Sequence, residues 1–160
     1  MRFQAFFLPC LLVLGAACQR TDRGNSSPLG SSTSTITTAD APLRETRWVL
    51  RQVAGQPVAA VPANGQEPFL RITAAGTAEG QGGCNTFRGG MEPATNDGEL
   101  KFAPLRSTRM ACPSLTIEQQ FSQALSATRA YRISGDTLLL YGNAERTGQP
   151  LARMEAVYLR

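Results

Sequence analysis

The chain has 160 residues, of which 42% are hydrophobic, and it carries a net charge of +4. This length accommodates one domain plus a targeting segment, and the hydrophobic content is sufficient for a packed core. The positive charges are spread thinly along the chain, so no basic cluster indicates nucleic-acid binding. Histidine is absent, which excludes Ser-His-Asp and Cys-His catalysis and most kinds of zinc site.

The first 17 residues have the parts of a signal peptide. Arg2 precedes an apolar run from Ala5 to Leu14, and three small residues lead to Cys18. The apolar run is too short for a membrane-spanning helix. The cysteine in this position resembles a bacterial lipobox, which implies a lipidated Cys18 and, with the glutamine that follows, an outer-membrane lipoprotein facing the periplasm. The alternative is an ordinary signal peptide cleaved near Ala17, which leaves a soluble periplasmic protein.

Residues 18–42 are predicted to form the lipidated cysteine and a flexible stalk. This stretch is dominated by Ser, Thr, Gly, Asn and Pro and has very few apolar residues. Such a composition cannot bury enough surface to offset the entropy of ordering the chain. The folded domain is therefore predicted to span residues 43–160.

Short segments with alternating polar and apolar residues predict strands in the first part of this domain. Trp48 lies in the first of them and is expected in the core. The sequence Asn96-Asp97-Gly98 is typical of a turn. The predicted strands are residues 46–53, 69–73, 77–81, 86–91 and 99–102.

One helix is predicted after residue 113, capped by Ser114 or by a capping box from Thr116 to Gln119. Its apolar positions recur with helical spacing, whereas Glu118 falls among the polar positions. Three more strands are expected at 130–134, 137–141 and 151–159. The sequence therefore predicts an α+β fold, a curved antiparallel sheet or partly open barrel of seven or eight short strands with one α-helix packed across it. The apolar helix positions are Ile117, Phe121, Ala124, Leu125 and Thr128.

Cys84 and Cys112 remain in the domain after Cys10 leaves with the signal peptide and Cys18 is assigned to lipid. Three interpretations are open: a structural disulfide, two buried thiols, or a redox or metal pair. A disulfide across these 28 residues would stabilise the domain by about 3–4 kcal/mol. A metal site is disfavoured because there is no CxxC motif and no histidine to complete a tetrahedral set.

Three motifs give the domain a family resemblance. They are Gly83-Cys84-Asn85, Leu100-x-Phe102 and the run from Thr108 to Pro113, which reads TRMACP. Together they resemble the META domain family, which includes HslJ-type heat-shock lipoproteins, over about residues 45–159. The resemblance implies a single α+β domain and a link to heat or envelope stress, antibiotic tolerance and motility. The family has no established catalytic mechanism, so no catalytic residue is inferred from it.

The expected function is that of a non-enzymatic envelope lipoprotein that binds or stabilises another envelope component. It would contact the membrane through its lipid anchor and would need no cofactor and no metal. Asn85, Thr108 and Arg109 have two interpretations. They either form a recognition surface or satisfy backbone groups around the two cysteines.

A second hypothesis is a carrier of a lipid or small apolar ligand, held in a cleft between the sheet and the helix. An enzyme is not expected. The carboxylates near the central motif occur in turn or surface contexts, which favours solvated side chains over acid–base pairs. These carboxylates are Glu79, Glu92, Asp97 and Glu99.

Overall fold

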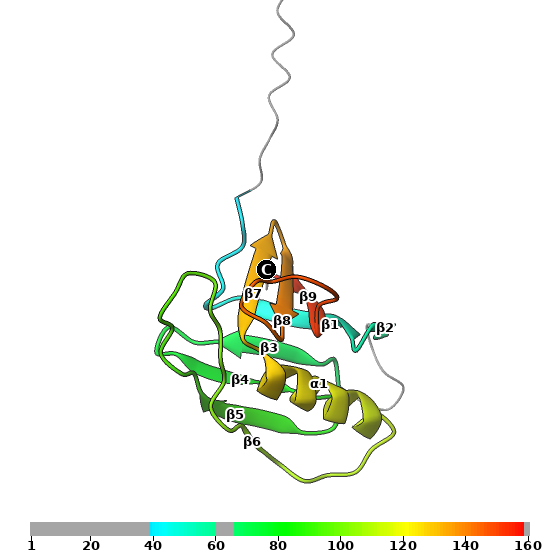
Figure 1. Cartoon of the computed structure of the whole chain (residues 1–160). Helices are drawn as coiled ribbons and strands as arrows, with labels where there is room; N and C mark the ends of the chain where they lie inside the picture. Colours follow the sequence, from blue (N-terminus) through cyan, green and yellow to red (C-terminus); the bar gives the residue numbers. More distant parts are fainter. Residues whose placement is uncertain (1–38, 60–65, 159–160) are drawn as a thin grey trace, which may run out of the picture. The chain divides into compact units, whose positions relative to one another are not determined.

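A computed structural model describes residues 39–59 and 66–158 (Figure 1). The predicted signal segment, Cys18 and the stalk up to residue 38 lie outside these residues. The described part of the chain forms nine strands and one helix, all strands being paired in one antiparallel sheet. The sheet runs from β6 at one edge to β7 at the other without closing, so the predicted α+β fold with a curved antiparallel sheet is confirmed.

The strand order in the sheet is β6-β5-β4-β3-β1-β9-β8-β7, with β2 paired to β1 as an extra edge. Two meanders, β3 to β6 and β7 to β9, are therefore joined by β1 in the middle. The strands are β1 (Arg47–Val53), β2 (Gln56–Pro57), β3 (Phe69–Ile72), β4 (Thr77–Gln81), β5 (Thr86–Gly90), β6 (Arg106–Ser107), β7 (Ala130–Ser134), β8 (Thr137–Tyr141) and β9 (Ala152–Val157).

The helix α1 (Leu115–Ala127) packs its apolar side against one face of the sheet, and this interface is the core (Figure 1). Phe121 and Leu125 are each only 1% exposed. The Phe121 ring meets the Phe87 ring edge to face, with 5.8 Å between centroids. Trp48 is completely buried, as expected, and its indole N–H donates a hydrogen bond of 3.0 Å to the carbonyl of Leu43.

No helix in the described ranges is both long and apolar enough to span a membrane.

Two details of the predicted helix are wrong. Ser114 is the N-cap but its side chain makes no capping hydrogen bond, and Thr116 lies inside the helix, so the capping box with Gln119 does not form. Glu118 is not on the solvent face but buried, with 8% of its surface exposed. Glu118 therefore lies in the first turn of α1, at the positive end of the helix dipole, and its side chain points toward the sheet, next to Cys84 and Asn85.

The predicted strand at 99–102 is also absent. Isolated bridges join Glu99 to Ala130 and Met91 to Phe102, but no continuous ladder forms there. The short strands β2 and β6 occupy segments for which no strand was predicted. Two-residue strands carry too few residues to show an alternating pattern, so a sequence pattern cannot reveal them.

Glu99 folds back onto the preceding turn instead of continuing a strand. Its carboxylate accepts hydrogen bonds from the backbone N–H groups of Thr95 and Asn96, at 2.7 and 3.2 Å. Lys101 Nζ donates to the same carboxylate at 2.5 Å. The hydrogen bond from Lys101, followed by those from Thr95, lowers the pKa of Glu99 from 4.5 to about 2.

The start of the domain includes residues assigned to the predicted stalk. The backbone N–H of Ala41 donates to the carbonyl of Gly135 at 2.9 Å, and the Asp40 carboxylate accepts from the N–H of Gly135 at 2.7 Å. Ala41 is buried in the core cluster. These contacts attach the chain to the β7–β8 turn before Leu43, the predicted beginning of the domain.

Carbon-detected NMR of the side-chain carboxyl groups should show Glu99 titrating at a pKa of about 2. Because the folded-state pKa is depressed from 4.5, the turn is stabilised by ionised Glu99 above about pH 4.5 and loses that contribution as the pH falls toward 2. Lys101→Met should move the pKa back toward 4.5, whereas Lys101→Arg should keep it low. An unchanged pKa in Lys101→Met would contradict the assigned cause.

Candidate functional site

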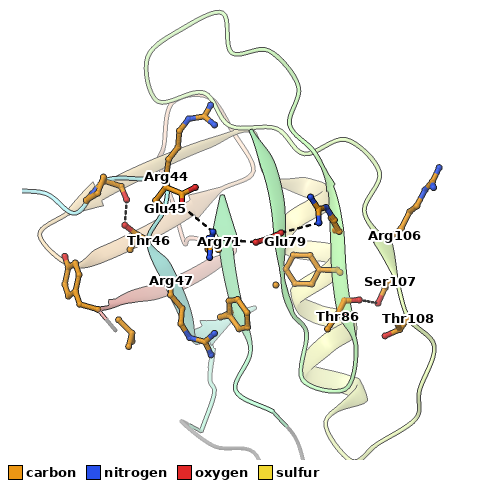
Figure 2. Close-up of a pocket in the computed structure, with 17 residues that line it drawn as sticks. Arg44, Glu45, Thr46, Arg47, Arg71, Glu79, Thr86, Arg106, Ser107 and Thr108 are labelled. Carbon is orange, nitrogen blue, oxygen red and sulfur yellow. Dashed lines mark hydrogen bonds and ion pairs between the residues drawn. The ribbon is translucent and has the colours of Figure 1, made fainter. Parts of the chain in front are cut away.

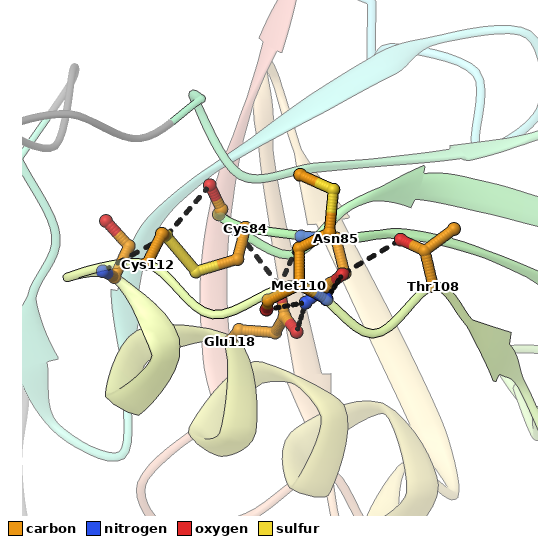
Figure 3. The surroundings of a disulfide bond; sticks show 8 residues. Cys84, Asn85, Thr108, Met110, Cys112 and Glu118 are labelled. Atoms are coloured by element: carbon orange, nitrogen blue, oxygen red, sulfur yellow. Dashed lines mark hydrogen bonds between the residues drawn. A yellow bond between two sulfur atoms is a disulfide. The ribbon is translucent and has the colours of Figure 1, made fainter.

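A disulfide joins the two ends of the central motif. Cys84 and Cys112 are bonded with an S–S distance of 1.99 Å and a Cα–Cα distance of 5.7 Å (Figure 3). The bond connects the loop that precedes β5 to the segment that leads into α1. Of the three interpretations left open by the sequence, the structural disulfide is confirmed.

The carboxylate of Glu118 anchors the loop that contains Cys84. Its Oε2 accepts hydrogen bonds from the backbone N–H groups of Cys84 and Asn85, at 2.9 and 2.6 Å. Its Oε1 accepts a hydrogen bond of 2.6 Å from the Asn85 side-chain amide. These are charge-assisted hydrogen bonds in a buried location, a class that is shorter and stronger than neutral ones.

Asn85 connects Glu118 to the segment between β6 and the helix. Besides Glu118, its Nδ2 donates to the carbonyl of Met110 at 2.9 Å. Its Oδ1 accepts from the Thr108 hydroxyl at 2.9 Å and from the backbone N–H of Met110 at 2.6 Å (Figure 3). Both donors and both acceptor positions of the amide are therefore occupied. We call Asn85, Glu118, Thr108 and the Met110 backbone the polar node.

Two glycines let the loop approach the helix closely. A side chain at Gly82 would place its Cβ 2.6 Å from Cγ of Glu118. Gly83 has a φ of +129°, a backbone conformation that residues with side chains rarely adopt. The glycine pair therefore permits the backbone geometry in which two successive N–H groups reach one carboxylate oxygen.

The predicted site residues are only partly brought together. Asn85 and the Thr108 hydroxyl take part in the polar node, which fits the interpretation that they satisfy buried groups around the cysteines. Arg109 is exposed and makes no side-chain hydrogen bond or ion pair with the described residues. It lies beside a hollow of about 630 Å³ bordered by Leu105 and Gln123. Cys18, the predicted lipidation site, lies outside the described residues.

A larger cavity of about 980 Å³ lies on the other face of the sheet, which we call the outer face (Figure 2). Leu70 is buried in the core, and its neighbour Arg71 projects from the opposite face because strand residues alternate. The register carries Arg71, Glu79 and Arg88 across β3, β4 and β5 on this outer face. Charged residues lining the cavity are Arg44, Glu45, Arg47, Arg71, Glu79, Arg88 and Arg106.

The lining has an excess of positive charge, with five arginines and two glutamates. Arg71 pairs with Glu45 at 3.3 Å and with Glu79 at 3.9 Å. Glu79 also pairs with Arg88 at 3.7 Å. One network of alternating charges therefore lies in the middle of the cavity and consists of Glu45, Arg71, Glu79 and Arg88. Arg106 lies at the rim of the cavity, outside this network.

Apolar and aromatic groups border the same cavity. The guanidinium of Arg47 lies 3.6 Å from the centroid of the Phe69 ring, a cation–π contact, and pairs with Glu67 at 3.5 Å. The Tyr158 hydroxyl donates a hydrogen bond of 2.7 Å to Asp136, and this bond raises the pKa of Tyr158. The cavity therefore offers cations, a neutral phenol and an aromatic surface to a ligand.

Sequence reasoning missed the cavity residues and the role of Glu118. Alternation along a strand can assign Arg71, Glu79 and Arg88 to the face opposite the core, but which strands are neighbours depends on the sheet order. Helical spacing placed Glu118 among the polar positions, so its buried role was not predicted. Within the described residues no group of three or more His, Cys, Asp or Glu could hold a metal ion.

Glu118→Gln should lower the free energy of unfolding by about 2–4 kcal/mol, because an amide cannot accept hydrogen bonds on both of its terminal atoms. The side-chain NH2 group of the introduced glutamine would then face an N–H donor of Cys84 or Asn85. Equilibrium urea denaturation measures the loss, with Gln119→Ala on the exposed side as the control, expected to change stability by less than about 0.5 kcal/mol. A similar small effect for both variants would contradict the role given to Glu118.

Replacing both Cys84 and Cys112 by serine should lower the free energy of unfolding by about 3–4 kcal/mol, because the unfolded chain regains the freedom that the bond removes. The same denaturation experiment with a reducing agent provides the control. The reductant should destabilise the wild-type domain and leave the double variant unchanged. Insensitivity of the wild type would contradict a stabilising bond.

The comparisons with known proteins concern almost the whole described chain. The sequence profile of the META domain family matches residues 41–158. A protein structure determined by NMR is 23% identical over 71% of this chain and 90% of its own length, with a TM-score of 0.53, and supports the fold alone. An NMR structure of a protein from Burkholderia xenovorans is 27% identical over 72% of this chain and 83% of its own, with a TM-score of 0.50. No curated protein matches the sequence.

The profile match includes the disulfide, the polar node and all nine strands of the described sheet. The chain belongs to the META domain family.

Proposed function

We propose that this META-domain protein is a non-enzymatic component of the bacterial envelope that binds another envelope component through the outer-face cavity. The observation that carries the proposal is the cavity itself, about 980 Å³ in volume and lined by arginines, threonines and Phe69. A hollow of this size is at the upper end of the range for ligand sites. Because the core lies on the opposite face, a partner can occupy the cavity without disturbing the packing.

The chemistry of the two polar regions supports a binding role rather than catalysis. In the polar node, the amide of Asn85 has no free donor or acceptor, and three N–H groups already occupy the Glu118 carboxylate. In the cavity, both lining glutamates are held in ion pairs with Arg71. In the polar node the Thr108 hydroxyl donates to an amide, and in the cavity the Tyr158 hydroxyl donates to Asp136, a bond that raises the pKa of Tyr158 and disfavours its use as a nucleophile.

The packing between helix and sheet argues against a carrier of a lipid or small apolar ligand in that space. Phe121 and Leu125 from α1 and Trp48 and Leu140 from the sheet are each at most 1% exposed. They belong to one continuous core cluster with Phe87. Side chains therefore fill the place where such a ligand would lie.

The proposed location is the outer membrane, with Cys18 lipidated and the domain facing the periplasm. Support comes from the lipobox resemblance and from the disulfide, since such bonds persist in oxidising compartments outside the cytoplasm. A soluble periplasmic protein is the alternative. A role in envelope stress or antibiotic tolerance is proposed from the family resemblance.

Mild crosslinking in cells followed by purification should enrich a defined partner with the wild-type protein and lose it with Thr86→Trp. Thr86 is an exposed residue on β5 that lines the cavity, so an indole there blocks access. Relative to the wild type, the captured partner should fall at least about tenfold, the loss expected for an interaction weakened by 1.4 kcal/mol or more.

Ser134→Trp provides the matched control. Ser134 is an exposed strand residue on β7, at the other edge of the sheet, and is not part of the cavity lining. This variant should capture as much partner as the wild type. Recovery of the same abundant envelope proteins with all three forms would refute the proposed function.

A further inference from the structure

A row of charged residues crosses the outer face from β3 to β6. The strand register pairs Arg71 with Glu79, Glu79 with Arg88, and Arg88 with Arg106. The charges alternate along the first three positions, and the ion pairs at 3.9 and 3.7 Å confirm that they interact. The alternation stops at the sheet edge, where Arg88 and Arg106 are neighbours.

Arg88 and Arg106 are a like-charge pair in directly opposed strand positions. The Cβ atoms in such a pair lie about 4.5–5.5 Å apart, and like charges there are destabilising. Arg88 shares Glu79 with Arg71, and no carboxylate among residues 39–59 and 66–158 pairs with Arg106. An anionic group placed between the two guanidinium groups would relieve this repulsion.

A second cation, which has no charged partner among the residues that the structure describes, lies on the other side of the cavity. The guanidinium of Arg44 donates to the carbonyls of Thr73 and Ala74, at 3.0 and 3.4 Å. These acceptors are neutral, so they orient the side chain without cancelling its charge. Figure 2 shows Arg44 and Arg106 at opposite sides of the cavity, with Arg71 and Glu79 between them.

The separation of these cations indicates an elongated ligand. Arg44 is bridged to Ile72 from the neighbouring position beside β3, and Arg106 lies on β6, so four strand steps separate them. At about 4.8 Å per step the two positions are roughly 19 Å apart. That distance corresponds to about six residues of an extended peptide, at about 3.3 Å each. A single phosphate group would contact only one of the two positions.

We propose that the outer-face cavity binds an extended acidic peptide segment of the partner, with one carboxylate between Arg88 and Arg106 and another near Arg44. This inference rests on the proposed function and specifies the chemistry of the partner. Arginine suits the role because its planar guanidinium can hold a carboxylate with two hydrogen bonds. Arg71 and Glu79 lie between these ends and are paired with each other, while Phe69 and Thr86 line the cavity two residues farther along their strands and offer a neutral surface beside the peptide.

Fluorescence anisotropy with the purified full-length chain tests the proposal. The probe is a labelled, end-blocked peptide of about ten residues that alternates glutamate and glycine, long enough to cover the roughly 19 Å between the two cations. Its glutamine–glycine counterpart serves as the neutral probe. The acidic peptide should bind and the neutral one should not, and Arg106→Gln should weaken binding about three- to tenfold.

Arg153→Gln is the matched control variant. Arg153 is exposed on β9, outside the cavity lining, and its loss changes the net charge by the same amount as Arg106→Gln. It should leave binding of the acidic peptide unchanged. Arg88→Gln, at the neighbouring position of the like-charge pair, should weaken binding as Arg106→Gln does. Circular dichroism spectra of all variants should match the wild type, because these three side chains lie on the surface.

Three results would overturn the acidic-peptide assignment. They are equal binding of the neutral probe, equal weakening by Arg153→Gln and Arg106→Gln, and displacement of the probe by inorganic pyrophosphate at the concentration at which unlabelled peptide displaces it. The first two indicate binding without charge selectivity at this site, and the third indicates a site for phosphates.

The crosslinking experiment distinguishes this inference from the proposed function. Loss of the partner with Thr86→Trp but full capture with Arg106→Gln would leave the proposed function standing and exclude an acidic segment at the rim. Full capture with both variants would exclude the cavity as the binding site and both proposals with it.

Discussion

The fold depends on a buried carboxylate that holds a glycine loop against a helix. Glu118 lies near the first turn of α1 and accepts the N–H groups of Cys84 and Asn85 on one oxygen. A buried charge is costly unless hydrogen bonds compensate it, and here three donors do so. The same arrangement provides partners for backbone groups that the irregular loop leaves outside the sheet ladders. Helix, loop and disulfide therefore form one connected structure.

This connection also determines the geometry of the outer face. Asn85 immediately precedes β5, and Thr108, which donates to it, immediately follows β6. The carbonyl of Thr86 accepts both the Ser107 hydroxyl and the Thr108 N–H, each at 3.1 Å. These bonds on the loop side fix the register of the two strands that carry Arg88 and Arg106. The polar node and the cavity thus have different roles, since one positions the side chains that the other presents.

Much of this architecture follows from local patterns in the sequence. Alternation identified seven of the nine described strands, helical spacing located the helix, and the even cysteine pair allowed a disulfide that the structure contains. The failures have physical causes. Glu99 captures the N–H groups of its own turn, which ends the extended pattern, and Glu118 is buried because three donors from a distant loop stabilise its charge. The cavity required the order of strands, which depends on contacts between distant segments.

The position of β1 in the sheet has a consequence for how the chain acquires its structure. The first long strand pairs with β3 on one side and with the last strand, β9, on the other, so Arg47 lies opposite Val157. A chain synthesised from its amino end leaves one edge of β1 open until nearly all residues have emerged. Folding that waits for such distant segments is slow. The central strand of the sheet therefore obtains its second neighbour only at the last step of synthesis, and the sheet is completed after the rest of the chain has been made.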